Sequence, residues 1–230
     1  MIRAQIILWS LVLMSSIAVG NDIYIQQSGD NLDLDVTQDG QNNVAGTSTT
    51  GISLTGDSMT FSINQVGNSN VISTTIAGNT YTGNIDLTGD SNTVDLSCDS
   101  AGAGNCETVS MSIDVTGDSA DITVSIGNTS DSENYVGTLD ITSNASETIT
   151  LTVNSTNADS DIDITNSTGL SGNTGTYTQS GNGDSAGHSL KHNHTGDGAV
   201  SNISQSGVYD NKIDLTTSGD NAEIDITQSD

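Results

Sequence analysis

Acidic side chains are the commonest groups in this chain that could do chemistry. The 230 residues include 29 Asp and Glu against three Lys and Arg, which gives a formal net charge of −26 at pH 7. Paired carboxylates act as a general acid and base only where they converge on one site. The pairs here recur along the chain, as in Asp33/Asp35 and Asp161/Asp163, and such repetition is typical of a solvated acidic surface. Since no P-loop or His-Glu-x-x-His motif accompanies them, we expect no enzyme activity.

Three histidines are the candidate metal ligands. His188, His192 and His194 lie near Lys191, and on a strand His192 and His194 would share one face. Because the segment offers three ligands and no carboxylate, a polar, hydrated loop is favoured over a transition-metal site. Gly-Asp turns also occur in calcium-binding nonapeptide repeats, but the spacing here is eleven residues. We therefore expect no cofactor and no dedicated metal site, with at most loose Ca²⁺ binding to the acidic faces.

The start of the chain has the pattern of a secretion signal. Arg3 precedes the apolar run Ile6–Met14, and Ala18-Val19-Gly20 offers a small-x-small cleavage site. The apolar run is too short to cross about 30 Å of hydrocarbon, so a membrane anchor is the less favoured interpretation. We predict that residues 1–20 are a signal peptide, that the mature chain is secreted, and that it does not insert into a membrane.

The mature chain has an unusual balance of charge and aromatic side chains. Lys191 and Lys212 are the only fixed positive charges after residue 20, so nucleic acid is an unlikely partner because phosphate groups would be repelled. Phe61 is its single Phe, which indicates a thin, repetitive core in place of a conventional globular one. Cys98 and Cys106 enclose seven residues, and in an exported chain we predict that they form a disulfide that closes a loop over 98–106.

A turn motif, here called the turn phrase, recurs along the chain: a small residue followed by Gly-Asp-Ser or Gly-Asp-Asn. Glycines fall eleven residues apart at Gly56, Gly67, Gly78 and Gly89. Eleven residues are enough for one short strand and one turn. The phrase occurs at Ser28-Gly29-Asp30-Asn31, Thr55-Gly56-Asp57-Ser58, Thr88-Gly89-Asp90-Ser91, Thr116-Gly117-Asp118-Ser119 and Ser218-Gly219-Asp220-Asn221.

Between the turns, apolar and polar residues alternate. Leu32, Leu34 and Val36 are separated by Asp33 and Asp35, which is the period of a strand with one buried and one wet face. Each strand offers two or three apolar residues, too few for stability alone, and stacking many such units would give a continuous core. We predict an all-β fold, a two-sheet parallel β-solenoid built from coils of about 22 residues with 11-residue half-repeats. A barrel or sandwich of antiparallel hairpins is the alternative.

A second phrase, apolar-x-Gln-x-Gly-x-x-Asn, occurs at Val36–Asn43 and Ile63–Asn70. It resembles the curlin repeat of bacterial curli fibre subunits, in which Gln-x4-Asn frames each strand. The alternative is that Gln-x-Gly is a general turn signature of β-solenoids. The resemblance covers both ends of residues 21–230 better than the segment from Thr80 to Asn166, where Thr or Ser replaces most of the Gln.

Buried amides suit such a stack because each can donate to the coil on one side and accept from the coil on the other. We therefore predict structural ladders of Gln and Asn side chains in the curlin-like domain 21–230. The predicted ladder residues are Gln27, Asn31, Gln38, Asn43, Gln65, Asn70, Gln179, Gln205, Asn211 and Gln228.

The resemblance implies a secreted structural protein. It would be a curli-like amyloid fibre subunit, as in a fimbrium, that associates with itself in an extracellular matrix or biofilm and supports cell adhesion. The alternative is a β-solenoid that does not polymerise and serves as an adhesin or as the receptor-binding rod of a phage tail fibre, with a cell surface or glycan as its partner.

Overall fold

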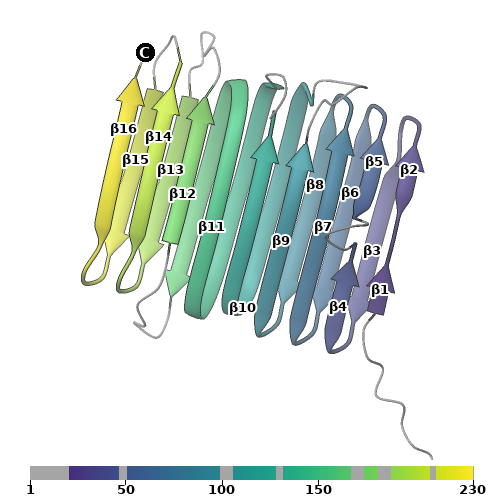
Figure 1. The fold of residues 1–230 in the computed structure, drawn as a ribbon, viewed down its shortest axis with the longest axis horizontal. Coiled ribbons are helices and arrows are strands. Elements are labelled where there is room, and N and C mark those ends of the chain that lie inside the picture. The colour runs from purple at the N-terminus through teal and green to yellow at the C-terminus, as the bar shows by residue number, and fades with distance from the viewer. Residues whose placement is uncertain are drawn as a thin grey trace, which may run out of the picture.

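The computed structural model describes residues 21–46, 51–98, 106–127, 132–166, 174–180, 188–207 and 211–229. These residues form strands joined by short turns, without a helix in the described ranges. Figure 1 shows the strands side by side, from β1 at one end of the molecule to β16 at the other. The strands are β1 (Asn21–Ile23), β2 (Gln26–Ser28), β3 (Asp33–Asp39), β4 (Asn42–Ala45), β5 (Ile52–Thr55), β6 (Met59–Val66), β7 (Ser69–Ala77), β8 (Tyr81–Thr88), β9 (Ser91–Cys98), β10 (Thr108–Ile126), β11 (Ser132–Asn166), β12 (Thr174–Ser180), β13 (His188–Thr195), β14 (Val200–Ser206), β15 (Asn211–Ser218) and β16 (Glu223–Ser229).

The strands form two layers, and the chain alternates between them. The first layer follows the pairing path β1-β4-β7-β9-β10-β11-β12-β14-β16, with β2 and β5 continuing β1 and β4. The second layer contains β3, β6 and β8 at one end and β13 and β15 at the other. Two long elements, β10 and β11, pass round the edge and contribute to both layers: β10 pairs with β8 through Val109–Thr116 and with β9 through Ser119–Ile126.

Every strand pair in the described ranges is parallel. This confirms the predicted β-solenoid, and the antiparallel alternative is wrong. Met59 lies opposite Tyr81, 22 residues further on, as the glycine spacing predicts. Other coils are longer: the ladder from Gln38 to Gln65 spans 27 residues.

The core lies between the two layers. Side chains alternate between buried and more exposed positions along the central strands, as in β6, where Met59, Phe61 and Ile63 are buried. Neighbouring coils place similar apolar residues over one another, because the parallel register aligns their turns. Gly83 lies between Phe61 and Met111, and a Cβ there would collide with both side chains. A thin core can thus hold a few large residues where a neighbouring coil supplies a small one.

The turns depend on glycine where the coils approach most closely. Gly56 has a φ of +139°, and a Cβ at this position would collide with the carbonyl of Gly29 in the preceding coil. Gly219 has a φ of +146° and the same relation to Gly196. Only glycine combines this backbone conformation with so close an approach, which explains the Gly-Asp turn phrase.

The disulfide is present as predicted. Cys98 and Cys106 are joined by an S–S bond of 2.01 Å, and both residues are fully buried. Residues 99–105 of this loop and the predicted signal peptide, 1–20, lie outside the described residues. In the part of the chain that the structure describes, no helix is long and apolar enough to cross a membrane.

Candidate functional site

The first interior ladder joins Gln38 of β3 to Gln65 of β6. Gln65 Nε2 donates to Gln38 Oε1 over 2.5 Å, and both side chains are buried. Each amide also reaches across the following turn to a backbone carbonyl: Gln38 Nε2 donates to Val44 (3.2 Å) and Gln65 Nε2 to Val71 (3.4 Å). These glutamines therefore join consecutive coils to each other and also join the two layers.

An asparagine ladder runs beside it in the first layer. Asn43 Nδ2 donates to Asn70 Oδ1 (3.2 Å), and Asn70 Nδ2 donates to Asn92 Oδ1 (2.9 Å). The same amides donate to turn carbonyls, as Asn70 does to Thr88 (2.9 Å). Buried amides are costly unless they are hydrogen-bonded, so these bonds fix the register of three successive coils.

The second glutamine ladder occupies the C-terminal end of the first layer. Gln205 Nε2 donates to Gln179 Oε1 (2.6 Å), and Gln228 Nε2 donates to Gln205 Oε1 (3.0 Å). Gln179 Nε2 donates to Ser160 Oγ (2.9 Å). In each of the three Gln–Gln hydrogen bonds described above, the residue later in the sequence donates to the earlier one, so the ladder has a direction.

The remaining predicted ladder residues do not join these ladders. Gln27 of β2 is half-buried and lies opposite Leu54. Asn31 is an exposed turn residue with a φ of +62°. Asn211 is half-buried opposite His188, and its Nδ2 donates to the carbonyl of Ser229 (3.4 Å). Sequence reasoning relied on Gln and Asn content, whereas the ladders require the same amide in successive coils.

Asn92 is a ladder residue that the sequence prediction missed. It follows Gly89 by three residues, as Asn43 follows Gly40 and Asn70 follows Gly67. The Gly-x-x-Asn spacing therefore contained the signal. The prediction missed Asn92 because the full motif also requires a Gln before the glycine. Leu87, which lies opposite Gln65, occupies that position. The glutamine ladder ends there, and Gln65 Oε1 has no hydrogen-bond partner among the described residues.

The histidine segment is a buried strand, so the prediction of a hydrated loop is wrong. His188, His192 and His194 alternate along β13 with their side chains in the interior. His192 packs against Tyr177, with ring centroids 5.0 Å apart, and its Nε2 lies 3.4 Å from Ser201 Oγ. The described residues contain no group of three or more His, Cys, Asp or Glu side chains that could hold a metal ion.

Burial controls protonation in this cluster. Desolvation lowers the pKa of His192 to about 4, with a smaller contribution from His194, and desolvation also lowers the pKa of His194. Burial raises the pKa of Tyr177 above its usual range, and the Glu147 carboxylate raises it further. Both imidazoles are therefore neutral at pH 7 and can pack inside the solenoid.

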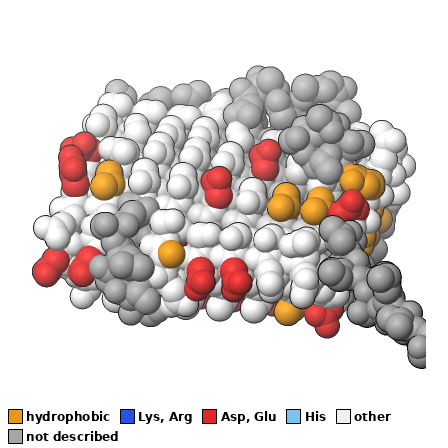
Figure 2. All heavy atoms as spheres, turned by 60° about the horizontal axis from the view of Figure 1, so that its bottom comes forward, with side chains coloured by type: hydrophobic (Ala, Val, Ile, Leu, Met, Phe, Trp, Pro, Cys, Tyr) orange, Lys and Arg blue, Asp and Glu red, His pale blue; other side chains and the backbone are white. Residues whose placement is uncertain are grey.

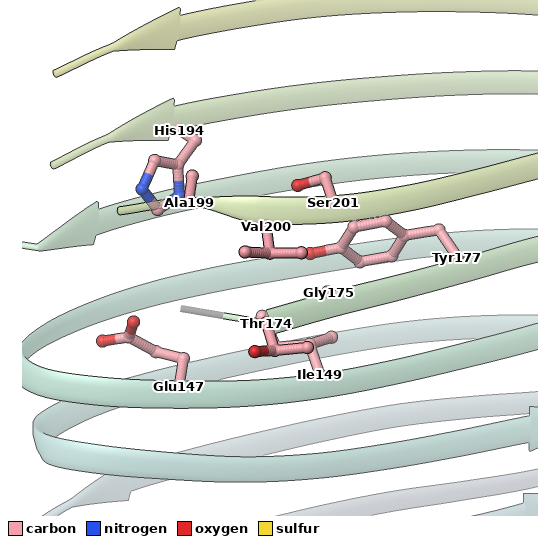
Figure 3. A pocket seen from close by; sticks show the side chains of 9 residues that line it. All are labelled: Glu147, Ile149, Thr174, Gly175, Tyr177, His194, Ala199, Val200 and Ser201. Atoms are coloured by element: carbon pink, nitrogen blue, oxygen red, sulfur yellow. The ribbon is translucent and has the colours of Figure 1, made fainter. Parts of the chain in front are cut away.

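A cavity of about 10 Å³ lies beside this cluster. Glu147 of β11, Tyr177 of β12 and His194 of β13 contribute to its lining, with Ala199 and Val200 (Figure 3). About 10–15 Å³ by this kind of measure accommodates one water molecule. The cavity is therefore too small for an organic substrate.

The outer faces are acidic. In the face seen in Figure 2, separate acidic and hydrophobic side chains stand among residues of other kinds, and no Lys or Arg side chain is visible in its described part. Asp86, Asp114 and Asp140 lie opposite one another on successive strands. Partial burial raises the pKa of Asp114, and the charges of Asp140 and Asp86 raise it further. Stacked coils therefore bring like charges together, which opposes stacking at low ionic strength.

The two ends of the described solenoid leave apolar side chains uncovered. At the C-terminal end, Ile226 of β16 is 48% exposed, and Ile213 and Leu215 of β15 are only partly buried. At the N-terminal end, Ile23 and Ile25 are also partly buried. Among the described strands, β16 pairs with β14 alone and β3 with β6 alone. Each end of the described solenoid therefore has a parallel strand edge that pairs with no other described strand.

The Asp residues of the turn phrase form a further set of contacts between coils. Asp57 N donates to Asp30 Oδ1 (2.9 Å), and Asn79 N donates to Asp57 Oδ1 (2.8 Å). Asp220 N donates to Asp197 Oδ1 (2.7 Å) at the C-terminal end. The carboxylate of one turn thus accepts from the backbone of the next.

Comparisons with protein-family models, with curated proteins and with solved structures find no match to this chain. The curlin resemblance therefore stays a prediction. The features available for a functional argument are the interior ladders, the acidic faces and the two open ends.

Proposed function

We propose that this chain is a secreted structural protein, the subunit of a curli-like fibre in which copies stack end to end in an extracellular matrix. The observation that carries this proposal is the pair of open solenoid ends. Among the described residues, each end combines a strand edge without a partner strand with apolar side chains that are not fully buried, including the exposed Ile226 at one end and the partly buried Ile23 and Ile25 at the other. Soluble β proteins usually cover or charge such edges, because open edges template association with another chain.

The interior chemistry supports growth by stacking. Every new coil extends the backbone ladder and can extend an amide ladder, as each coil does from Gln179 through Gln205 to Gln228. Identical amides in register satisfy one another. An added copy would thus gain the contacts that coils inside one chain already make.

The acidic faces set the conditions for assembly. A net charge of −26 opposes the approach of two copies, and salt shortens the screening length from about 30 Å at 0.01 M to about 3 Å at 1 M. We expect the mature chain to stay soluble at low salt and neutral pH, and to form thioflavin-positive fibrils as salt, Ca²⁺ or mild acid reduces repulsion. Calcium acts here by loose binding to carboxylates, without a dedicated site.

A pair of end variants tests the proposal. Ile226→Lys places a charge in the inward row of β16, whereas Thr227→Lys adds the same charge to the outward face of the same strand. Fibril yield at high salt, measured by sedimentation and electron microscopy, should fall at least about tenfold for Ile226→Lys because an unpaired charge would be buried at the joint. Thr227→Lys should assemble like the wild type. Equal yields from both variants would contradict end-to-end stacking.

A rod that does not polymerise is the second candidate function, and the net charge of −26 favours it because like charges repel along a stack. In that case the solenoid is a spacer that presents a loop to a cell surface or glycan. Such a chain would remain monomeric across the whole salt series while binding cells or a defined glycan.

A further inference from the structure

The two end coils of the described solenoid repeat the same sequence. Residues 21–39 form β1, β2, a turn and β3, and residues 211–229 form β15, a turn and β16. The turn backbones match as well: Gly29 and Gly219 have φ values of +129° and +146°, and Asn31 and Asn221 have φ values of +62° and +61°. Nine of the nineteen aligned positions are identical, namely Asn21/Asn211, Ile23/Ile213, Ser28/Ser218, Gly29/Gly219, Asp30/Asp220, Asn31/Asn221, Asp35/Asp225, Thr37/Thr227 and Gln38/Gln228.

These matching coils lie in opposite layers. The strands β1 and β2 belong to the first layer, which ends in β16, whereas β3 belongs to the second layer, which ends in β15 (Figure 1). The described chain thus begins and ends in the same layer. The equivalent of β16, namely β3, lies on the other side of the solenoid.

This placement decides how two copies can stack without a gap. Suppose that the next copy is added in the same orientation. In the first layer, β16 of one copy would then pair with β1 and β2 of the next. In the second layer, β15 of one copy and β3 of the next would be separated by one empty strand position. That gap, about 4.8 Å of strand spacing, would leave backbone N–H and C=O groups unpaired at the joint, which is costly. Turning the next copy by half a revolution about the fibre axis removes the gap.

We propose that copies of this chain stack head to tail with a half-turn between successive copies. In this arrangement β16 pairs with β3 of the next copy, and β15 pairs with β1 and β2. The inference rests on the fibre function proposed above and adds the identity, register and rotation of the contact. Each copy then continues the solenoid of the copy before it, with matching coils directly stacked.

The directional hydrogen bonds agree with this joint. Inside the chain, later glutamines donate to earlier ones, so Gln228 Oε1 would accept from Gln38 of the next copy and link the two glutamine ladders. The turn contacts follow the same rule. Inside the chain, the backbone N–H of the later turn donates to the Asp carboxylate of the earlier turn, as Asp57 does to Asp30 and Asp220 does to Asp197. At the joint, the backbone N–H of Asp30 in the next copy would therefore donate to Asp220 Oδ1. Without the half-turn these two turns lie on opposite edges.

One pair of opposite charges forms at this joint, whereas Glu223 and Asp225 lie opposite Asp33 and Asp35 of the next copy. With Asn211 aligned to Asn21, the exposed Lys212 of β15 lies opposite the exposed Asp22 of the next copy. Lys212 is one of two positive charges after residue 20, and it lies in the coil that meets the next copy. A positive charge at this position reduces the repulsion between two acidic chains.

Cysteine pairs distinguish the two orientations. With the half-turn, Thr227 lies opposite Thr37 of the next copy. If the next copy were instead added without the half-turn, its first layer would continue the first layer of the copy before it. The register of that layer aligns Thr227 with Gln26, so Thr227 would then lie opposite Gln26 of the next copy. All three residues are exposed, and β3 and β16 lie at opposite ends of one molecule, so a bond between them must join two copies (Figure 1). The test uses two double variants of the full mature chain. The first carries Thr37→Cys and Thr227→Cys, the second carries Gln26→Cys and Thr227→Cys, and both are oxidised after assembly at high salt.

We expect about tenfold more covalent dimer and higher species from the Thr37→Cys/Thr227→Cys chain, because paired strands lie within disulfide reach. Neither variant should cross-link as a monomer at low salt. Fibres that cross-link through Gln26→Cys instead, or through neither pair, would overturn the half-turn while leaving the fibre function intact. Absence of fibres by electron microscopy in the wild type and both variants would overturn the fibre function and this joint with it.

Discussion

At the scale of single residues, the interior of this solenoid tolerates polar side chains where a neighbouring coil or turn supplies a hydrogen-bond partner. Asn43, Asn70 and Gln205 are buried amides bonded to amides in the next coil. His192 is different, because it is buried against Tyr177 with one nitrogen near Ser201, and its Nδ1 has no hydrogen-bond partner among the described residues. Its neutrality is therefore a condition of stability.

The first prediction concerns acid sensitivity at His192. Burial lowers its pKa from 6.5 to about 4 in the folded chain, so the unfolded chain takes up a proton at a higher pH than the folded chain does. Stability is therefore lost as pH falls from about 6.5 to about 4, by up to about 3 kcal/mol. Urea unfolding of the monomer at low salt should show this loss between pH 7 and pH 4.

His192→Leu should reduce that loss by about 2 to 3 kcal/mol, since leucine cannot be protonated. Asn193→Leu, on the same strand, is the matched control and should keep the wild-type pH dependence. If wild type and His192→Leu lose the same free energy of unfolding on acidification, the interior His192 does not control the acid response.

At the scale of strands and turns, register is set by amide ladders and glycine turns together. Gln65 and Asn70 flank the turn between β6 and β7. The Asn70 amide bonds to Asn43 and Asn92 in the coils on both sides, and the Gln65 amide bonds to Gln38 in the preceding coil. Replacing both by Ala would leave buried groups of Gln38, Asn43 and Asn92 without these partners. The cost per buried unsatisfied group is about 1–3 kcal/mol.

The second prediction follows from this arrangement. Gln65→Ala with Asn70→Ala should slow fibril elongation from preformed seeds, whereas Asp33→Asn with Asp35→Asn, which removes two outward charges of β3, should speed it. Thioflavin growth rates at one fixed salt concentration measure both effects. Slower growth of the Asp variant, or wild-type growth of the amide variant, would contradict the separate roles given to the interior ladder and the outer face.

Much of the arrangement of strands and turns could be predicted from the sequence. The turn phrase and the alternation of Leu34 and Val36 with Asp33 and Asp35 were sufficient to predict stacked parallel coils. The predicted length of about 22 residues holds between β6 and β8, whereas Tyr81 of β8 and Val109 of β10 are 28 residues apart. The β13 strand could not be recognised, because His188, His192 and His194 occupy its inward positions and read as polar residues. His192 packs against Tyr177 of β12 and lies near Ser201 of β14, and the pattern of β13 alone does not show that these strands lie beside it.

The ladder assignment was limited for a similar reason. Gln27 matches the motif, yet its neighbour in the next coil is Leu54, so no amide is available to it there. Asn92 lacks the preceding Gln but lies over Asn70. A ladder is a property of two coils, and their relative register depends on extra residues such as those between β4 and β5, which lengthen that coil to 27 residues.

At the scale of the whole molecule, the proposed fibre depends on a balance between its end strands and a net charge of −26. We expect the ends to favour stacking and the charge to oppose it until salt screens the faces. The half-turn joint adds a geometric requirement, because matching end coils meet only in that orientation. The fibre and the monomeric rod are thus distinguished by whether the ends of two copies associate once salt screens the repulsion between them.

The most direct test is electron cryomicroscopy of the mature chain assembled at high salt. The account predicts filaments one solenoid wide, with parallel strands perpendicular to the axis at about 4.8 Å spacing, continuous across the joints between copies. Monomers that persist at every salt concentration, or filaments whose strand ladder breaks at each joint, would contradict the claim that this solenoid is a fibre subunit that grows from its open ends.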